Sequence, residues 1–153
     1  IDLAEVFFQD QPGVKNYYEV KLFKLFYETR YDPQTGEMDT LGVVENAVYV
    51  DGYNDPNVQA GFYNGGLISD QFFDGQTYKF QARFDSQSYG TADSSIVVRV
   101  RHVTEDYFKW SRSYEANYEV DENPLVEPVS IYHNLENGLG IFSVSNRKDI
   151  EIH

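Results

Sequence analysis

The sequence predicts a mainly β fold, an antiparallel β-sandwich with one aromatic-rich α-helix packed against it. Three observations support this prediction. Apolar and polar residues alternate with a period of two in several segments, which is typical of half-buried strands. Residues that favour turns, namely Gly, Pro, Asn and Asp, separate these segments. A single segment, which begins at Thr104, instead carries aromatic side chains at helical spacing.

The first third of the chain contains three predicted strands, at residues 5–8, 16–29 and 43–50. Turns at residues 10–13 and 32–36 separate them, and Pro33 suits the second position of its turn. In the long middle strand Tyr18, Val20, Leu22 and Phe26 share one face. Lys24 lies among them, so we expect a bulge or a strand end there.

The clearest alternation lies in two predicted strands at residues 76–84 and 95–101. Tyr78, Phe80, Ala82 and Phe84 face one way in the first of them, and charged or polar residues face the other way. The polar segment 85–94 lies between the two strands. We interpret it as the loop of a hairpin that joins them.

The helix is predicted to begin at Thr104, which suits the N-cap position, with acidic residues in the first turn. It should end before residues 121–124, where the Asn-Pro pair disfavours helix. Its aromatic stripe is expected to cover one open face or end of the sheet; the stripe comprises Tyr107, Phe108, Trp110, Tyr114 and Tyr118. Short strands at residues 141–144 and 150–152 complete the prediction.

The most distinctive motif is a turn built around Asn134, Asn137, Gly138 and Gly140. Glycine adopts positive φ values that other residues resist, and Asn tolerates the left-handed region. We expect a tight turn that leads into a short strand. On this interpretation a Gly138→Val substitution would destabilise the domain by roughly 1–3 kcal/mol through backbone strain.

Composition limits the classes of function. The chain has 153 residues, which suits one β-rich domain spanning residues 1–153, and its formal net charge is −13. That charge argues against nucleic-acid binding, which needs clustered Lys and Arg, and leaves open a divalent cation or a cationic partner. There is no Cys, and no apolar run reaches the ~20 residues of a membrane-spanning helix.

No motif for catalysis, for a cofactor or for a metal is found. The three histidines, His102, His133 and His153, are far apart in the sequence and form no metal-ligand pair. No nucleophile elbow is present, and Ser111 and Ser113 are expected to be structural. A glycosidase needs two facing carboxylates; Glu45, Asp51 and Asp70 could supply them only if the fold brought them together.

Two loop regions are candidates for binding. The segment Asp51-Gly52-Tyr53-Asn54-Asp55-Pro56-Asn57 offers the oxygen ligands that calcium prefers, but its spacing does not fit an EF-hand loop and we favour a solvated loop with Asx turns. Tyr53, Phe62 and Tyr63 lie among glycines and are candidate ligand contacts, since exposed aromatic side chains provide large contact areas. The alternative for Phe62 and Tyr63 is a strand packed on the core.

Three stretches resemble a known family. They are the paired tyrosines of Asn16-Tyr17-Tyr18, the acidic-aromatic turn at residues 69–78, and the ordered set of helix, proline segment 123–128 and glycine turn 134–142. Together they cover most of the chain. They are similar to domain-of-unknown-function family 4249, found in outer-membrane-associated proteins of the Bacteroidota.

The resemblance implies a surface-exposed domain of an outer-membrane lipoprotein that acts with a TonB-dependent transporter in nutrient capture. Members of the family are typically longer and carry a lipoprotein signal, an anchoring Cys and an additional N-terminal module. We therefore expect this chain to be the C-terminal domain of such a protein, attached to the membrane only through an upstream lipid anchor. The resemblance brings no active-site residue with it.

We therefore expect a non-enzymatic binding or accessory domain whose partner is an outer-membrane transporter or another surface protein, with a small molecule or glycan as a further candidate ligand. The first alternative is a structural or adhesion module that mediates contacts between surface proteins. The second is a carbohydrate-active enzyme, which would require a deep cleft with two facing acids.

Overall fold

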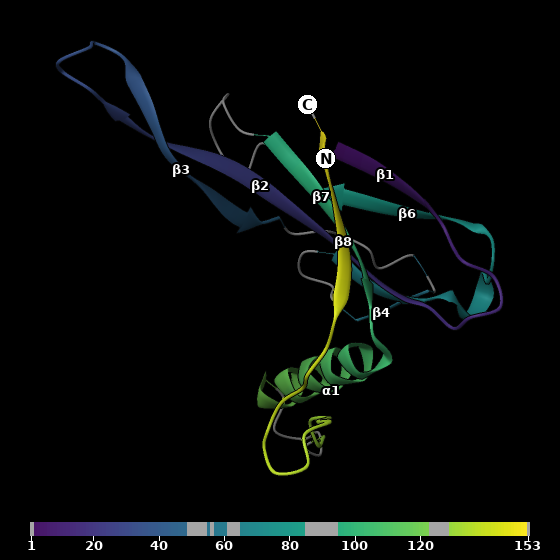
Figure 1. The fold of residues 1–153 in the computed structure, drawn as a ribbon. Coiled ribbons are helices and arrows are strands. Elements are labelled where there is room, and N and C mark those ends of the chain that lie inside the picture. The colour runs from purple at the N-terminus through teal and green to yellow at the C-terminus, as the bar shows by residue number, and fades with distance from the viewer. Residues whose placement is uncertain are drawn as a thin grey trace.

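The computed structural model describes residues 2–48, 55, 57–60, 65–84, 95–122 and 129–152. These residues form two antiparallel sheets and a single α-helix (Figure 1), so the predicted mainly β fold is confirmed. The elements are, in chain order, β1 (Asp2–Gln9), β2 (Tyr17–Tyr31), β3 (Met38–Ala47), β4 (Val58–Ala60), β5 (Gly65–Ser69), the 3-10 turn η1 (Asp70–Phe72), β6 (Thr77–Phe84), β7 (Ser95–Val103), α1 (Glu105–Glu122) and β8 (Ser145–Ile152).

Strand pairing divides the described strands into a small and a large sheet. The small sheet contains β1 and β6, and the large sheet has the order β4-β5-β2-β7-β8, with β3 also paired to β2. The predicted hairpin around residues 85–94 is wrong, because β6 pairs with β1 whereas β7 lies between β2 and β8. Alternation indicates which face of a strand is buried, but pairing depends on residues far away in the sequence.

The main core lies between the two sheets, which pack face to face as the predicted sandwich. Alternate side chains of β2 (Tyr18, Val20 and Leu22) meet Val6 of β1 and Phe80 of β6 in one buried cluster. Side chains in β6 alternate strictly between buried and exposed, as the sequence predicts. This side of the large sheet therefore faces the small sheet.

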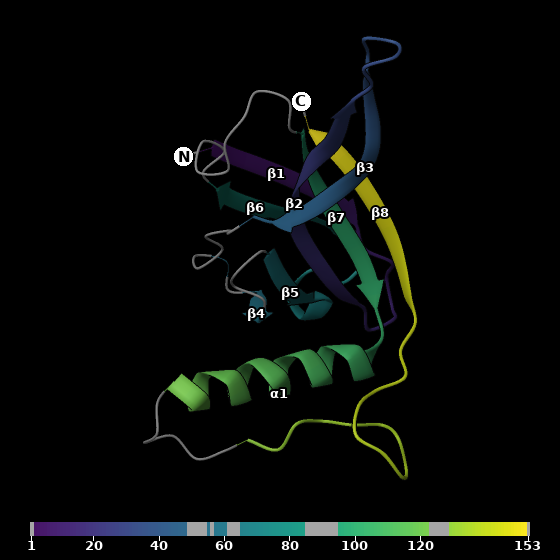
Figure 2. The ribbon, with the colours of Figure 1, turned by 90° about the vertical axis from the view of Figure 1, so that its left-hand side faces the viewer.

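The helix packs on the opposite side of the large sheet. Tyr17 of β2, Leu67 of β5 and Val103 of β7 form a second buried cluster with Phe108 of α1. Figure 2 shows α1 lying across the end of the sheet where β7 finishes. The predicted N-cap is confirmed, since the Thr104 Oγ1 accepts a hydrogen bond of 3.3 Å from the backbone N–H of Tyr107.

A buried carboxylate ties the helix to the sheet. Glu19 of β2 accepts hydrogen bonds from Arg101 of β7 and, at 2.7 Å, from the Tyr107 hydroxyl, while the Lys21 ammonium lies 3.0 Å away. Burial, followed by the charge of Glu19, raises the pKa of Tyr107 above its ordinary value. Removing one partner of such a group leaves an uncompensated buried charge, so this network holds the start of α1 against the sheet.

Beyond the body of the domain, β2 and β3 continue as a two-stranded ribbon, which we define as residues 26–45. The pairing of β2 with β7 ends at Leu25, opposite Ser95, whereas its pairing with β3 continues to Tyr31. The ribbon therefore extends beyond the other strands of the large sheet, away from the small sheet and from the helix, as Figure 1 shows at its upper left.

Two predictions about local structure are wrong. Lys24 causes neither a bulge nor a strand end: it pairs with Asn46 on one side and Ile96 on the other, and the irregularity lies between Glu28 and Thr29. A lysine can bury its aliphatic stem in a strand that is held on both sides. Residues 141–144 form no strand, and regular pairing resumes only at β8.

The central position of Phe80 leads to a stability prediction. Its side chain is fully buried between the sheets, so Phe80→Ala should lower the free energy of unfolding by about 3–5 kcal/mol. Chemical denaturation monitored by circular dichroism measures this change. The control is Arg83→Ala on the exposed face of the same strand, which should change stability by less than about 0.5 kcal/mol. A small effect of Phe80→Ala would contradict the packing of the two sheets.

Candidate functional site

The turn at residues 134–142 is closed by one side chain. The Asn134 Oδ1 accepts a hydrogen bond of 2.8 Å from the N–H of Phe142, and its Nδ2 donates one of 2.9 Å to the carbonyl of the same residue. The Asn134 amide thus pairs with the backbone of Phe142 as a residue of a neighbouring strand would. A backbone bond of 3.3 Å from Asn134 to Gly140 completes the turn.

This turn holds apolar side chains in solvent. Leu139 is 95% exposed and Phe142 is 74% exposed. Large apolar side chains gathered on a surface mark sites of interaction more often than chance exposure does. Because the Asn134 clamp fixes the loop, little conformational entropy remains to be lost when these side chains meet a partner.

Positive φ in the turn belongs to Gly140 rather than to Gly138. Gly140 has a φ of 120°, whereas Gly138 has no positive φ, and a Cβ at Gly138 would meet only the side chain of Leu135 at 3.7 Å. The expectation that Gly138 carries the strain is therefore wrong. Two candidate glycines separated by one residue cannot be distinguished from the sequence without knowledge of the backbone path. Asn137 is exposed within the same turn.

The segment that carries the turn is anchored on α1. The Tyr132 hydroxyl donates a hydrogen bond of 2.5 Å to one carboxylate oxygen of Asp106, and the Asn134 Nδ2 donates one of 2.9 Å to the other. The backbone N–H of Tyr132 donates to the Ser113 Oγ at 2.8 Å, and that hydroxyl donates to the carbonyl of Trp110. Ser113 is therefore structural, as expected.

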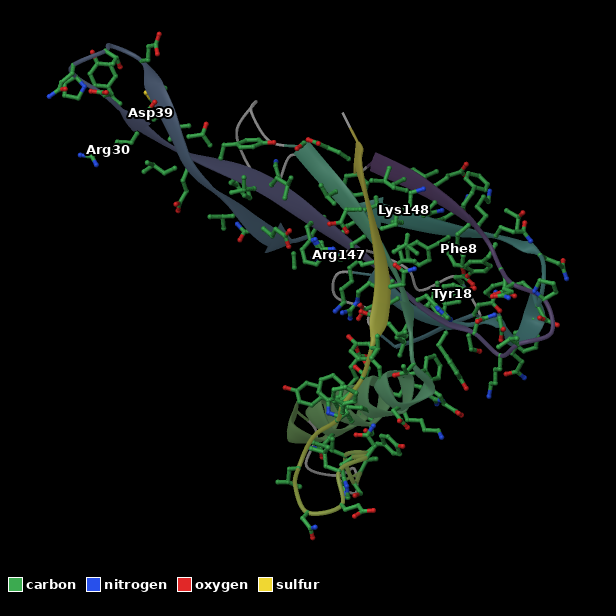
Figure 3. The ribbon with its side chains drawn as sticks, viewed as in Figure 1. Phe8, Tyr18, Arg30, Asp39, Arg147 and Lys148 are labelled. Carbon is green, nitrogen blue, oxygen red and sulfur yellow. The ribbon has the colours of Figure 1, made fainter. Side chains whose placement is uncertain are left out.

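A second candidate is a shallow groove of about 170 Å³ beside β8. Phe8 of β1 and Tyr18 of β2 form its aromatic wall, with ring centroids 4.6 Å apart, and Figure 3 shows both near Lys148 of β8. The described residues that line the groove include no carboxylate; they are Phe8, Gln9, Tyr18, Val100, His102, Asn146, Arg147 and Lys148. The groove could hold one ring of a ligand against the aromatic wall.

The wall of the groove continues into a polar network. The Tyr18 hydroxyl donates a hydrogen bond of 2.5 Å to the Asp10 Oδ1, which also accepts one from the Asn16 Nδ2. Burial, followed by this bond to Asp10, raises the pKa of Tyr18 above its ordinary value. The His102 Nε2 lies 3.0 Å from the Asn16 Oδ1. His102 therefore holds its neighbours in place at the edge of the groove.

Three aspartates come together at the turns that precede β2 and β6. One carboxylate oxygen each of Asp10, Asp70 and Asp74 lies within 4.8 Å of the others. Each of these residues also accepts a hydrogen bond from a backbone N–H: Asp10 from Gly75, Asp70 from Asn16 and Asp74 from Gly13. Carboxylates in this arrangement can bind a hard cation, but they already hold the turns together.

Most residues of the two predicted binding loops lie outside the part of the chain that the structure describes. Tyr53, Phe62 and Tyr63 lie outside the described residues, as does most of the loop 51–57. The described part of that loop forms an Asx turn, in which the Asp55 Oδ1 accepts a hydrogen bond of 2.9 Å from the N–H of Asn57. The Tyr78 hydroxyl donates to the other oxygen of Asp55.

Glu45 and Asp70 do not form the carboxylate pair of a glycosidase. Glu45 binds the Arg99 guanidinium at 2.8 Å, which lowers the pKa of this carboxyl below its ordinary value. Asp70 lies instead among the three aspartates, and Asp51 is outside the described residues. The sequence did not reveal the groove or the aspartate cluster, because their members are distant along the chain. Phe8 was predicted only as a strand residue, and Lys148 was assigned to no predicted element.

The fold and these features define a mainly β domain that presents a clamped apolar turn, a shallow groove and a projecting ribbon. The chain belongs to the family described as Domain of unknown function (DUF4249), whose profile matches residues 2–151. This match confirms the family resemblance that the sequence motifs indicate. No curated protein and no solved structure matches the chain. Within the described residues, no helix combines the length and apolar character needed to cross a membrane.

The positive φ of Gly140 can be tested directly. Gly140→Ala should lower the free energy of unfolding by about 1–3 kcal/mol, because a Cβ has free space there but the backbone angle is unfavourable for Ala. Gly138→Ala is the matched control and should change stability by less than about 0.5 kcal/mol. Equal effects of the two substitutions on the melting temperature would show that the turn has another conformation.

The anchor of the turn should depend on pH at both ends of the scale. The hydrogen bond from Tyr132, followed by that from Asn134, lowers the pKa of Asp106. The anchor therefore stabilises the fold fully above the pKa of an unfolded Asp, about 3.9, and this stabilisation is lost as the pH falls through the pKa of Asp106 in the folded protein. The same bond raises the pKa of Tyr132. The contribution of this hydrogen bond to the free energy of unfolding is therefore present below about pH 10. It is lost as the pH rises through the pKa that Tyr132 has in the folded protein.

The measurement is the difference in unfolding free energy between the wild type and Tyr132→Phe as a function of pH. We expect a difference at neutral pH that disappears in strong acid and in strong alkali. The control is Tyr114→Phe, at an exposed position of α1, the helix that carries Asp106. A difference for Tyr132→Phe that stays constant across the pH range would show that Asp106 does not hold the hydroxyl.

Proposed function

We propose that this chain is a non-enzymatic accessory domain of a surface-exposed outer-membrane lipoprotein, which acts with a TonB-dependent transporter in nutrient capture. Membership of the DUF4249 family is consistent with this role. The observation that carries the proposal is the clamped turn, which holds Leu139 and Phe142 in solvent. A rigid loop with exposed apolar side chains is suited to docking on another protein.

Burial of the two apolar side chains of this turn would contribute substantially to the free energy of binding. Burying a Leu or Phe side chain that is otherwise exposed stabilises a complex by about 1.5–3 kcal/mol. Two such residues on one preformed loop would thus contribute the central contact of a modest interface. The surrounding polar groups, Asn134 and Asp106, already form hydrogen bonds within the domain. They therefore keep these partners if a docked protein excludes water from the turn.

The non-enzymatic part of the proposal is supported by how the described acidic side chains are used. Asp10 and Asp70 are buried and accept hydrogen bonds from loop backbone, and Glu19 joins the sheet to the helix. These are positions in which a carboxylate holds a structure together. Asp70 and Asp74 do line an open pocket of about 270 Å³, but this volume is below the range of typical small-molecule sites. A catalytic carboxylate would instead face a cleft large enough for a substrate.

A second candidate function is a structural or adhesion module that binds other surface proteins without capturing a nutrient. The size of the groove favours it. At about 170 Å³, the groove is smaller than the roughly 300–1,000 Å³ of typical small-molecule sites. Binding of a nutrient in this groove would therefore involve only one ring or one short group of the ligand.

Co-purification from the outer membrane tests the proposed function. The full-length protein, tagged and extracted in mild detergent from the cells that encode it, should bring down an outer-membrane transporter barrel identified by mass spectrometry. A Leu139→Asn, Phe142→Asn variant should recover at least about tenfold less of that barrel, because it loses two buried apolar side chains. Leu3→Asn, at an exposed residue of β1, is the matched control and should recover as much as the wild type.

Two results would contradict the proposal. The first is that no transporter barrel is enriched over an untagged strain. The second is that the turn variant, with an unchanged melting temperature, recovers the barrel as well as the wild type does. If a different surface protein is recovered and depends on the turn, the adhesion module becomes the better explanation.

A further inference from the structure

The ribbon of residues 26–45 exposes apolar side chains on one face. Tyr27 lies opposite Val43, and Tyr31 lies opposite Met38, and directly opposite residues of an antiparallel pair share a face. Tyr31 is 58% exposed and Met38 is 60% exposed. Alternation places this face on the same side of β2 as Tyr17, which is the side that packs against α1 in the body of the domain.

The ribbon lacks the support that the rest of the large sheet has. In β2, residues 27–31 pair only with β3 among the described strands, since β7 reaches no further than Leu25. An isolated two-stranded hairpin is marginally stable in water, and unpaired edges readily accept another strand. Leu41, which lies at the irregularity between Gly42 and Thr40, is exposed as well. A surface of this kind is completed by a partner.

The charge of the ribbon limits what that partner can be. Residues 26–45 contain five acidic residues and one Arg; they are Glu28, Asp32, Glu37, Asp39, Glu45 and Arg30. Figure 3 shows Arg30 and Asp39 on the two strands near the tip, and these two residues lie opposite each other in the register. Glu45 is already paired with Arg99 of β7, and alternation places Glu28 and Asp39 on the face opposite to Tyr31 and Met38. The acidic residues that border the apolar face are therefore Asp32 and Glu37, which follow Tyr31 and precede Met38 at the tip of the ribbon.

A second copy of this chain would be a poor occupant. Each copy carries a formal net charge of −13, and two acidic ribbons facing each other would repel. A partner with an apolar strip between basic side chains would instead match both the apolar face and its acidic border. Electrostatic complementarity of this kind selects the partner and raises the rate of association.

We propose that the ribbon is a second docking element, separate from the clamped turn, and that it binds an apolar strip bordered by Lys or Arg side chains on the protein partner. This inference rests on the proposed function for the existence of a protein partner. It adds the element that makes the contact and the chemistry of the surface it contacts. Tyr31 and Met38 form the apolar centre, and Asp32 and Glu37 form the acidic border.

Site-specific photo-crosslinking in intact cells tests this inference. Benzoylphenylalanine replaces Tyr31 or Met38 in the full-length protein, and at the control position it replaces Phe7, which is 58% exposed on β1. We expect an adduct at positions 31 and 38 that is at least about fivefold stronger than at position 7. Mass spectrometry should place the crosslink on a peptide of another protein, next to a Lys or Arg residue.

Two further variants test the acidic border. Glu37→Lys, at the tip of the ribbon, should lower the adduct yield at position 31 severalfold, whereas Glu151→Lys on the exposed part of β8 should leave it unchanged. In isolated outer membranes the yield should also fall as ionic strength rises from ~0.05 to ~0.5 M, since salt screens attraction between exposed charges. Melting temperatures equal to that of the wild type establish that each variant is folded.

The inference is overturned by any of four results: no adduct at positions 31 and 38, equal adducts at position 7, adducts between two copies of this chain, or adducts unaffected by Glu37→Lys. These results are distinguishable from failure of the proposed function. If the transporter barrel co-purifies through the turn but the ribbon forms no adduct, only the ribbon inference fails. If the ribbon forms the expected adduct with a protein that is no transporter, only the proposed function fails.

Discussion

The structure depends on one long strand that lies in two different environments. In its first half, β2 is paired on both sides and packed on both faces: Tyr18 enters the core between the sheets, and Tyr17 enters the core beneath the helix. In its second half, the same strand has β3 as its partner and lies in solvent. A rigid body and a projecting ribbon are therefore parts of one continuous strand.

Polar networks fix the two ends of this arrangement. Asp10, held by Tyr18 and Gly75, joins the turns that precede β2 and β6, and Glu19 joins β2 and β7 to the first turn of α1. The network around Asp106 then positions the clamped turn on the helix. The clamped turn is thus attached to the scaffold by a carboxylate that already has hydrogen-bond partners, whereas the ribbon is the continuation of β2 itself.

Local pattern predicted most of the strands and the helix, because alternation and capping are properties of neighbouring residues. The buried face of β6 and the N-cap at Thr104 were predicted correctly for this reason. The partners of β6 and β7 were not, since pairing is decided by burial across the whole chain. Likewise, the sequence indicated an unusual turn at Asn134 but not that its side chain would pair with the backbone of Phe142, nor that Gly140 rather than Gly138 has the positive φ.

Native-state hydrogen exchange along β2 tests the central claim, which is that the scaffold is stable on its own whereas the ribbon is stabilised by binding a partner. In the isolated domain, the amides of Val20 and Leu22 should exchange only through global unfolding, whereas those between Tyr27 and Tyr31 should exchange through local opening. In the complex with a membrane partner, the second group should become protected while the first remains unchanged. Uniform protection along β2 in the isolated domain, or no gain within the ribbon on binding, would contradict this claim.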